Sequence, residues 1–338
     1  MRDVFDSGIE LTTEVLEKIK RDGFSGLVTG VSAAVEYRIW NFLFFDRFEW
    51  WQRRGIHVLR VSRWSPVPDT SEIDRQLWTE ESELDGIEVR EDEQLRTLAA
   101  FRNKYGEEYA ELPDLESEKT EPYQYYTRNG TFETVDGEIL YCMVRENRPD
   151  RVLQIGGGFS TRALAAALDD GSIDCTVTVF EPYRDTWLNE DSRAEFTLAG
   201  RGATDIDVDR FERLERGDIL FVDSFHVLRV GNDLYTLLFD GLPRLSEGVL
   251  VHFHDIFLPS EYPAEWVFER FSFLNEQYAV RAFLLFNDRF EVRWAGKYMH
   301  DTHPEALADA FESYDPSLAG SGAEMFAPNS LWLEVTEE

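Results

Sequence analysis

Cysteine, lysine and histidine are all scarce in this chain of 338 residues. The two cysteines, Cys142 and Cys175, cannot form a disulfide framework and are predicted to be small buried side chains. The first residues lack a basic stretch followed by an apolar run, so no signal peptide is predicted. The most apolar early stretch, 31–45, contains Glu36 and Arg38 and is too short to span a bilayer. We therefore expect a soluble, cytoplasmic protein with no membrane partner.

Basic residues are few relative to acidic ones. Asp and Glu number 66 against 34 Lys and Arg, which gives a formal charge of −32, and five of the cations are lysines. Such a chain repels nucleic-acid phosphates and anionic lipid, and no basic patch stands out, so nucleic-acid binding is not expected. Excess acid with little lysine is typical of proteins from high-salt cells, where salt screens self-repulsion. We interpret the charge as the adaptation of a halophile.

Aromatic residues are abundant and set the first 121 residues apart. They make up 14% of the chain, which supplies large side chains for a hydrophobic core. The stretch 39–51 is rich in Phe and Trp, and Pro66 and Pro68 mark a loop. Apolar residues three to four positions apart predict a helix over 91–109. We predict an N-terminal, mainly helical cap region over 1–121 and a second domain over 122–338.

In the second domain, short apolar strands alternate with amphipathic helices. We predict helices at 135–146, 161–168, 232–242 and 266–274, and strands at 152–155, 176–180, 218–223, 248–254, 278–286 and 330–335. This alternation predicts an α/β fold with a mostly parallel sheet covered on both faces. In such folds, ligands bind beyond the carboxyl ends of the strands.

A glycine-rich turn, Gly156, Gly157 and Gly158, connects the first of these strands to a helix. Glycines let the backbone turn sharply and approach a ligand, and the helix start adds unpaired N–H groups, with Ser160 or Thr161 as candidate caps. Glu181 follows the next strand, 25 residues after Gly156, where an acid can accept both ribose hydroxyls of an adenosine. The turn has no third glycine of the dinucleotide pattern. An adenosyl ligand without pyrophosphate is therefore favoured over a dinucleotide or a purely structural turn.

Asp and His residues gather after two further strands. Asp223 ends one strand and His254 with Asp255 ends the next, and His226 follows shortly after the first. Such side chains can deprotonate a substrate hydroxyl or hold a divalent ion such as Mg²⁺, Mn²⁺, Zn²⁺ or Fe²⁺. We predict Asp223, His254 and Asp255 as catalytic residues, and the same three with His226 as candidate metal ligands. His252 lies deeper in its strand and is interpreted as a core histidine.

Together these segments resemble the class I S-adenosylmethionine-dependent methyltransferases, and in particular the branch called methyltransferase family 24. The resemblance rests on 152–161, 180–183, 217–226, 242–259 and 261–263, and reaches back to 129–132, 136–141 and, more loosely, 65–69. It implies a Rossmann-like sheet of seven strands, the last antiparallel. It also implies that S-adenosylmethionine lies over the glycine turn with its ribose on Glu181, near Ser160. Such enzymes usually have an acid where this chain has Gln154, which offers the cofactor's ammonium a hydrogen bond but no charge.

The resemblance implies methyl transfer from S-adenosylmethionine to the hydroxyl of a small molecule or sugar. Two alternatives stay open. One is a non-catalytic adenosyl-binding or interaction protein, which Gln154 motivates. The other is a hydroxylase-like or nicotinamide-dependent enzyme on the same fold. The expected partner is a small-molecule acceptor that the sequence does not specify, and a homo-oligomer is left open.

Overall fold

The chain divides into two units, Met1–Ile73 and Asp74–Glu338. The computed structural model describes residues 47–59, 61–79, 84–181, 195–199, 206–318 and 327–337, with the single positions 35, 38, 39, 41, 42 and 204. In the first unit, the short helix α2 (Phe48–Gln52) has no buried residue. None of the helices described in either unit is long and apolar enough to cross a membrane. The cap region over 1–121 and the domain over 122–338 stay predictions.

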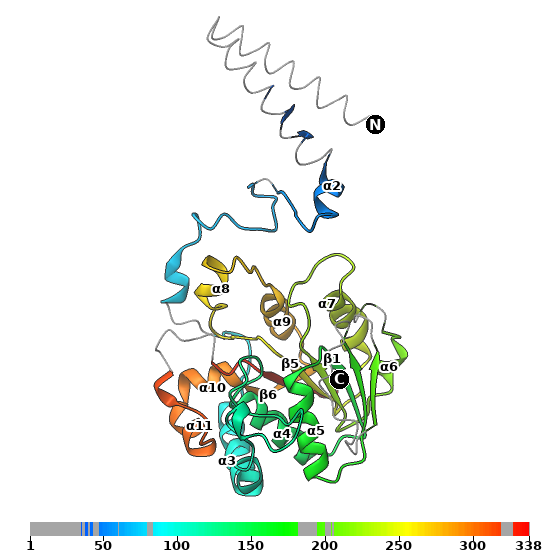
Figure 1. Ribbon diagram of the computed structural model, residues 1–338, viewed down its shortest axis with the longest axis vertical. Coiled ribbons are helices and arrows are strands. Elements are labelled where there is room, and N and C mark those ends of the chain that lie inside the picture. The colour runs from blue at the N-terminus through cyan, green and yellow to red at the C-terminus, as the bar shows by residue number, and fades with distance from the viewer. Residues whose placement is uncertain are drawn as a thin grey trace, which may run out of the picture. The chain divides into compact units, whose positions relative to one another are not determined.

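A seven-stranded sheet with the order β3-β2-β1-β4-β5-β7-β6 forms the centre of the second unit (Figure 1). Strands β1 to β5 pair in parallel, whereas β7 is antiparallel to both of its neighbours, β5 and β6. This topology confirms the predicted α/β, Rossmann-like fold with an antiparallel last strand. The strands are β1 (Arg151–Ile155), β2 (Thr176–Phe180), β3 (Glu195–Ala199), β4 (Ile219–Val222), β5 (Leu250–Phe253), β6 (Phe290–Ala295) and β7 (Leu331–Val335).

Helices cover both faces of the sheet. The described helices of this unit are α3 (Glu91–Tyr109), α4 (Asp136–Asn147), α5 (Phe159–Asp170), α6 (Asp209–Glu212), α7 (Asp233–Thr236), α8 (Ala264–Phe268), α9 (Glu276–Leu285), α10 (Gly296–Thr302) and α11 (Pro304–Ala310). Shorter 3₁₀ turns lie at Arg75–Trp78, Glu116–Glu118, Leu242–Arg244 and Pro316–Leu318, and a π turn continues α7 over Leu237–Gly241.

Successive side chains of each strand enter two separate apolar layers. Val152 of β1 packs in the layer that contains α3, α4 and α5. Leu153, the next residue, packs in the layer that contains α7 and α9. Cys142 and Cys175 are free thiols buried in the first layer, as predicted. The strands are thus buried on both sides, which leaves their carboxyl ends as the place for a ligand site.

The late part of the chain differs from its prediction. Residues 278–286, predicted as a strand, belong mostly to helix α9, in which Val280 and Leu284 are buried one turn apart. The strand lies further on, in β6, where buried side chains alternate with more exposed ones. An apolar run of this length is compatible with a helix or a strand. The prediction assumed the two-residue period of a strand, whereas the segment is helical. The helix predicted at 266–274 is also shorter, since α8 ends at Phe268.

One buried carboxyl of the fold titrates near neutral pH. Glu138 lies in the first turn of α4 and is 2% exposed. It accepts a hydrogen bond from the Val135 N–H at 2.7 Å and another from the Ser313 hydroxyl. Burial raises the pKa of Glu138 to about 7, even though both hydrogen bonds favour the ionised carboxylate.

We expect Glu138→Gln to change how stability depends on pH. Unfolding returns Glu138 to its ordinary, lower pKa, whereas the folded chain keeps the proton up to about pH 7. Glu138 therefore costs the folded state increasing stability as pH rises through this window, and a constant amount above it. Between about pH 5 and pH 8, urea denaturation should show the free energy of unfolding falling less in E138Q, by on the order of 2 kcal/mol. Parallel profiles of the two proteins would contradict the buried titration.

Candidate active site

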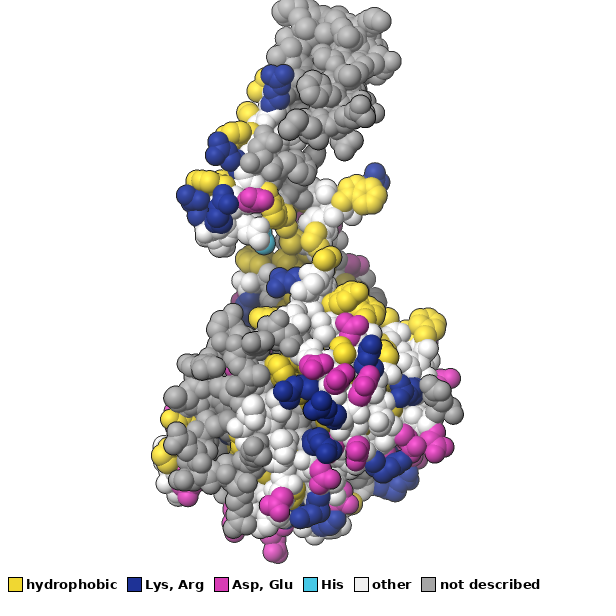
Figure 2. Space-filling model, turned by 90° about the vertical axis from the view of Figure 1, so that its right-hand side faces the viewer, with side chains coloured by type: hydrophobic (Ala, Val, Ile, Leu, Met, Phe, Trp, Pro, Cys, Tyr) yellow, Lys and Arg dark blue, Asp and Glu magenta, His cyan; other side chains and the backbone are white. Residues whose placement is uncertain are grey.

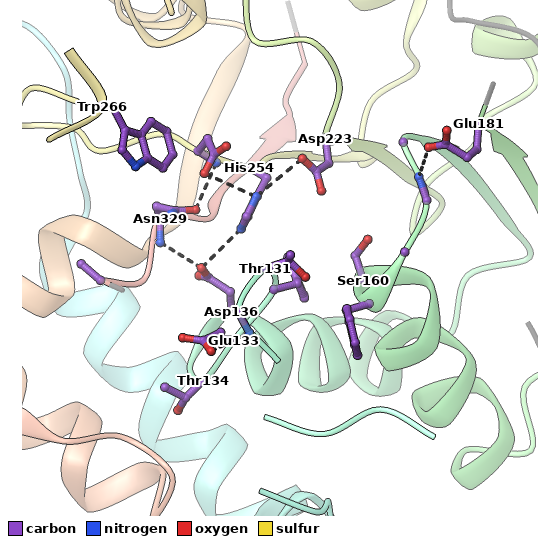
Figure 3. A pocket seen from close by; sticks show the side chains of 18 of the residues that line it. Thr131, Glu133, Thr134, Asp136, Ser160, Glu181, Asp223, His254, Trp266 and Asn329 are labelled. Carbon is purple, nitrogen blue, oxygen red and sulfur yellow. Dashed lines mark hydrogen bonds and ion pairs between the residues drawn. The ribbon is translucent and has the colours of Figure 1, made fainter. Parts of the chain in front are cut away.

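A cavity of about 540 Å³ lies at the carboxyl edge of the sheet. Ligand sites in proteins usually enclose roughly 300–1,000 Å³. The walls combine the glycine turn, the residues that follow β2, β4 and β5, and the segment 130–136 that leads into α4 (Figure 3). All three predicted catalytic residues line this cavity, as does every predicted cofactor residue except Gln154.

The glycines of the turn have different roles. Gly156 has a φ of +85°, and a Cβ there would lie 1.7 Å from the carbonyl oxygen of Asp223. Gly158 has a φ of +150°, and a Cβ there would meet no atom within 4 Å. Gly156 is therefore needed for the packing of β1 against the end of β4. Gly158 lies on open space and is the position at which a ligand could approach the backbone.

Glu181 faces the glycine turn. Its Oε2 accepts a hydrogen bond from the Gly157 N–H at 3.1 Å (Figure 3). Gln154 lies behind the turn, where it is buried and donates from Nε2 to Ser160 Oγ at 3.0 Å. Its Oε1 is buried without a hydrogen-bond partner. Ser160 lines the cavity and Gln154 does not. The contact between Gln154 and a cofactor therefore stays a prediction.

The predicted Asp and His residues meet in one network. His226 Nε2 lies 3.4 Å from Asp223 Oδ1 and 3.3 Å from Asp255 Oδ2. Its Nδ1 lies 2.7 Å from Glu276 Oε2. His254 Nδ1 lies 3.6 Å from Asp223 Oδ1 and 3.7 Å from Asp255 Oδ1. His226 and Asp255 both have positive φ, +54° and +57°, so the surrounding contacts hold two strained backbone positions in place.

Opposite charges set the protonation states in this network. Burial disfavours the imidazolium forms of His226 and His254, but the surrounding carboxylates raise both pKa values well above the ordinary value. Burial also opposes ionisation of Asp223, yet the two imidazoliums hold its pKa below its usual range. Burial raises the pKa of Asp255 above its usual value, although the same imidazoliums favour its ionised form. Both histidines are therefore charged at neutral pH, and Asp255 is the more basic aspartate.

Three residues of the site were missed by the sequence analysis: Asp136, Glu276 and Asn329. Asp136 Oδ2 lies 3.7 Å from His254 Nε2 and accepts a hydrogen bond from the Asn329 N–H at 2.9 Å (Figure 3). Asn329 Oδ1 in turn accepts one from the Asp255 N–H at 3.1 Å. Asp136 could have been found, because it starts a segment that carries the resemblance. Glu276 begins the helix that was mistaken for a strand, and no sequence signal marks Asn329.

His252 lies outside this network, which confirms its interpretation as a core histidine. It is fully buried, and its Nε2 lies 2.8 Å from Ser330 Oγ. Its ring stacks on Phe221 with the centroids 3.9 Å apart. Burial lowers the pKa of His252 well below the ordinary value, so the imidazole stays neutral.

The candidate metal ligands are not arranged as a coordination site. Within the described parts of the chain, no group of three or more His, Cys, Asp or Glu side chains is placed to hold a metal ion. His226 directs Nδ1 at Glu276 and does not line the cavity. The divalent ion stays a prediction.

Comparison with known proteins links the region of this cavity to methyltransferases. Residues 153–256 match a family model described as a methyltransferase domain. The matched stretch contains the glycine turn, Glu181 and the predicted Asp and His residues. An uncharacterized protein of Archaeoglobus fulgidus is 28% identical over 168 residues, which are 46% of this chain and 73% of that protein.

Two solved structures are also similar to this chain. The SAH-bound methyltransferase PaMTH1 of Podospora anserina is 13% identical and superposes with a TM-score of 0.38, covering 73% of this chain and 88% of that one. A structure of cmcI with Mg and SAM is 15% identical and superposes with a TM-score of 0.35, covering 61% of this chain and 73% of that one. The fold assignment rests on the strand order of the sheet itself.

We expect Gly156→Ala to destabilise the protein strongly. The added methyl group would overlap the Asp223 carbonyl, and the positive φ adds backbone strain. Gly130→Ala is a matched control, because Gly130 has a φ of +83° and no atom within 4 Å of the new Cβ. The free energy of unfolding, measured by urea denaturation, should fall by roughly 1–3 kcal/mol more in G156A than in G130A. Equal losses would contradict the close approach of β1 to the end of β4.

Proposed function

We propose that the protein is an S-adenosylmethionine-dependent O-methyltransferase whose acceptor is a hydroxyl group of a small molecule or sugar. The family match over 153–256 and the strand order of the sheet support this proposal. The observation that carries the proposal is the shared cavity. The glycine turn and Glu181 line one part of it, and Asp223, His254 and Asp255 line another.

The cofactor part of the cavity suits an adenosyl group. The open space over Gly158 admits a ligand directly against the backbone, and the Glu181 carboxylate faces the same turn. We assign Glu181 to the ribose hydroxyls and Gly156–Gly158 to the floor beneath the cofactor. When bound, S-adenosylmethionine supplies an electrophilic methyl group on a positively charged sulfonium. The acidic lining, which includes Glu133, Asp136 and Asp223, favours a ligand of that charge.

We assign deprotonation of the acceptor hydroxyl to the Asp/His network. His254 was predicted as a catalytic base, but an imidazolium cannot accept a proton, so we assign it to hold Asp223 and Asp255 in place. Asp255 lines the cavity and has the raised pKa, which makes it the better base. A hydroxyl must lose its proton during attack on the methyl group, whereas a neutral amine needs no base to begin the attack. This difference favours oxygen as the acceptor atom.

We expect Glu181→Gln to weaken binding of S-adenosylmethionine at least tenfold. The amide keeps the size of the side chain but replaces a charged acceptor, whose hydrogen bonds contribute about 1.5–3 kcal/mol, by a neutral one. Isothermal titration calorimetry of both proteins measures the difference. Glu269→Gln, at an exposed position outside the cavity, is the control. No heat with S-adenosylmethionine would contradict the proposal. Stabilisation of the protein by NADH would contradict it in favour of a nicotinamide-dependent enzyme.

We expect Asp255→Asn to lower the rate of methyl transfer without a matching loss of cofactor affinity. Removing a general base costs roughly 10²–10⁴ in rate. Transfer of labelled methyl from S-adenosylmethionine to a panel of hydroxylated acceptors gives the rate, and calorimetry gives the affinity. Asp92→Asn, at an exposed position of α3, is the matched control. Wild-type binding of the cofactor without turnover on any acceptor would support the non-catalytic alternative.

A further inference from the structure

The first unit contains a segment whose charge is opposite to that of the rest of the chain. Residues 47–64, here called the arginine–aromatic segment, contain five arginines and one glutamate in a chain of formal charge −32. The net charge of the whole chain hides this local excess. The same segment has a Phe and three Trp residues interleaved with the arginines.

Apolar side chains of this segment are exposed. Trp64 is 83% exposed and Val61 is 69% exposed, and Ile56 and Leu59 are both more than two-fifths exposed. Single exposed apolar residues are ordinary, but these four lie within nine residues of one another. Figure 2 shows hydrophobic and basic side chains next to one another on the surface of this part of the chain. The segment therefore presents an apolar surface and positive charge together.

The arginines are arranged around the aromatic rings. The Arg54 guanidinium lies 3.7 Å from the centroid of the Trp50 ring and donates a hydrogen bond to the Trp50 carbonyl at 3.0 Å. Arg63 lies 5.4 Å from the centroid of the Trp64 ring. Arg53 lies 3.8 Å from Glu49, but both side chains are largely exposed, so this pair compensates little of the charge. The guanidinium groups are thus held beside apolar rings and stay accessible to anions.

We propose that the arginine–aromatic segment docks the protein on an anionic lipid bilayer, lying within the interface between water and lipid. Arginines attract anionic headgroups, and Trp side chains are enriched at the depth where headgroups meet acyl chains. The exposed aliphatic side chains of Ile56, Leu59 and Val61 favour lipid over nucleic acid as the partner of this segment. Aliphatic side chains neither stack on bases nor bind phosphates, whereas burial in the acyl region removes them from water. This inference does not depend on the proposed enzymatic function.

Flotation of the full chain with vesicles tests the proposal. Vesicles of phosphatidylcholine containing phosphatidylglycerol should bind the protein at about 0.1 M salt, and vesicles of phosphatidylcholine alone should bind it at least tenfold more weakly. The double variant Arg53→Glu with Arg54→Glu should lower binding to the anionic vesicles at least tenfold. Trp64→Ser should lower it several-fold, and this loss should persist at about 1 M salt, where a Debye length of about 3 Å screens the charges.

Controls from the second unit separate a docking segment from general surface effects. Arg229→Glu reverses an exposed charge, and Phe286→Ser removes an apolar side chain that is 90% exposed. Both should bind vesicles as wild type does, and circular dichroism should show every variant folded. Equal effects of control and segment variants, or no preference for anionic vesicles, would overturn the proposal. A dimer that W64S dissociates, or an RNA oligonucleotide that binds in place of vesicles, would overturn it in favour of that occupant.

Discussion

The site depends on the mutual compensation of buried charges at the ends of the strands. Four carboxylates, of Asp136, Asp223, Asp255 and Glu276, surround the imidazoliums of His226 and His254. An isolated buried ion costs several kcal/mol, so neither set could stay ionised without the other. Burial raises the pKa of Asp255 and of Glu276, and the imidazoliums oppose that rise in both.

The sheet was predictable where the sequence pattern is local and unambiguous. Strands β1 and β2 are short runs of buried residues beside turn residues, and the glycine turn follows β1 directly. Helix α9 was predicted as a strand, because 278–286 is apolar enough for either period and only contact with the sheet decides. Helix α3, which lies within the predicted cap region, packs against α4, α11 and β6 of the second unit.

The candidate site was predictable only in part, for a geometric reason. Asp223 and Asp255 follow neighbouring parallel strands, whose carboxyl ends must share one edge of the sheet. Asn329 reaches the same edge from the opposite direction, because β7 inserts antiparallel beside β5 and pairs Leu331 with Phe253. No local pattern reveals that antiparallel partner. The deep position of Gln154 was equally hidden, because its register in β1 does not say whether Ser160 stands between it and the cavity.

The two parts of the cavity are joined through one backbone contact. Asp223 donates its N–H to the Ile155 carbonyl at 2.8 Å, which continues the pairing of β1 with β4 beyond the strands. The next residue, Gly156, packs so closely on the Asp223 carbonyl that no side chain fits between them. The residue that starts the glycine turn therefore also fixes the backbone of an aspartate in the Asp/His network. If the glycine turn shifts on ligand binding, we expect the backbone of Asp223 to shift with it, because closely packed interiors transmit displacement. The start of the glycine turn and the backbone of Asp223 are therefore expected to move together.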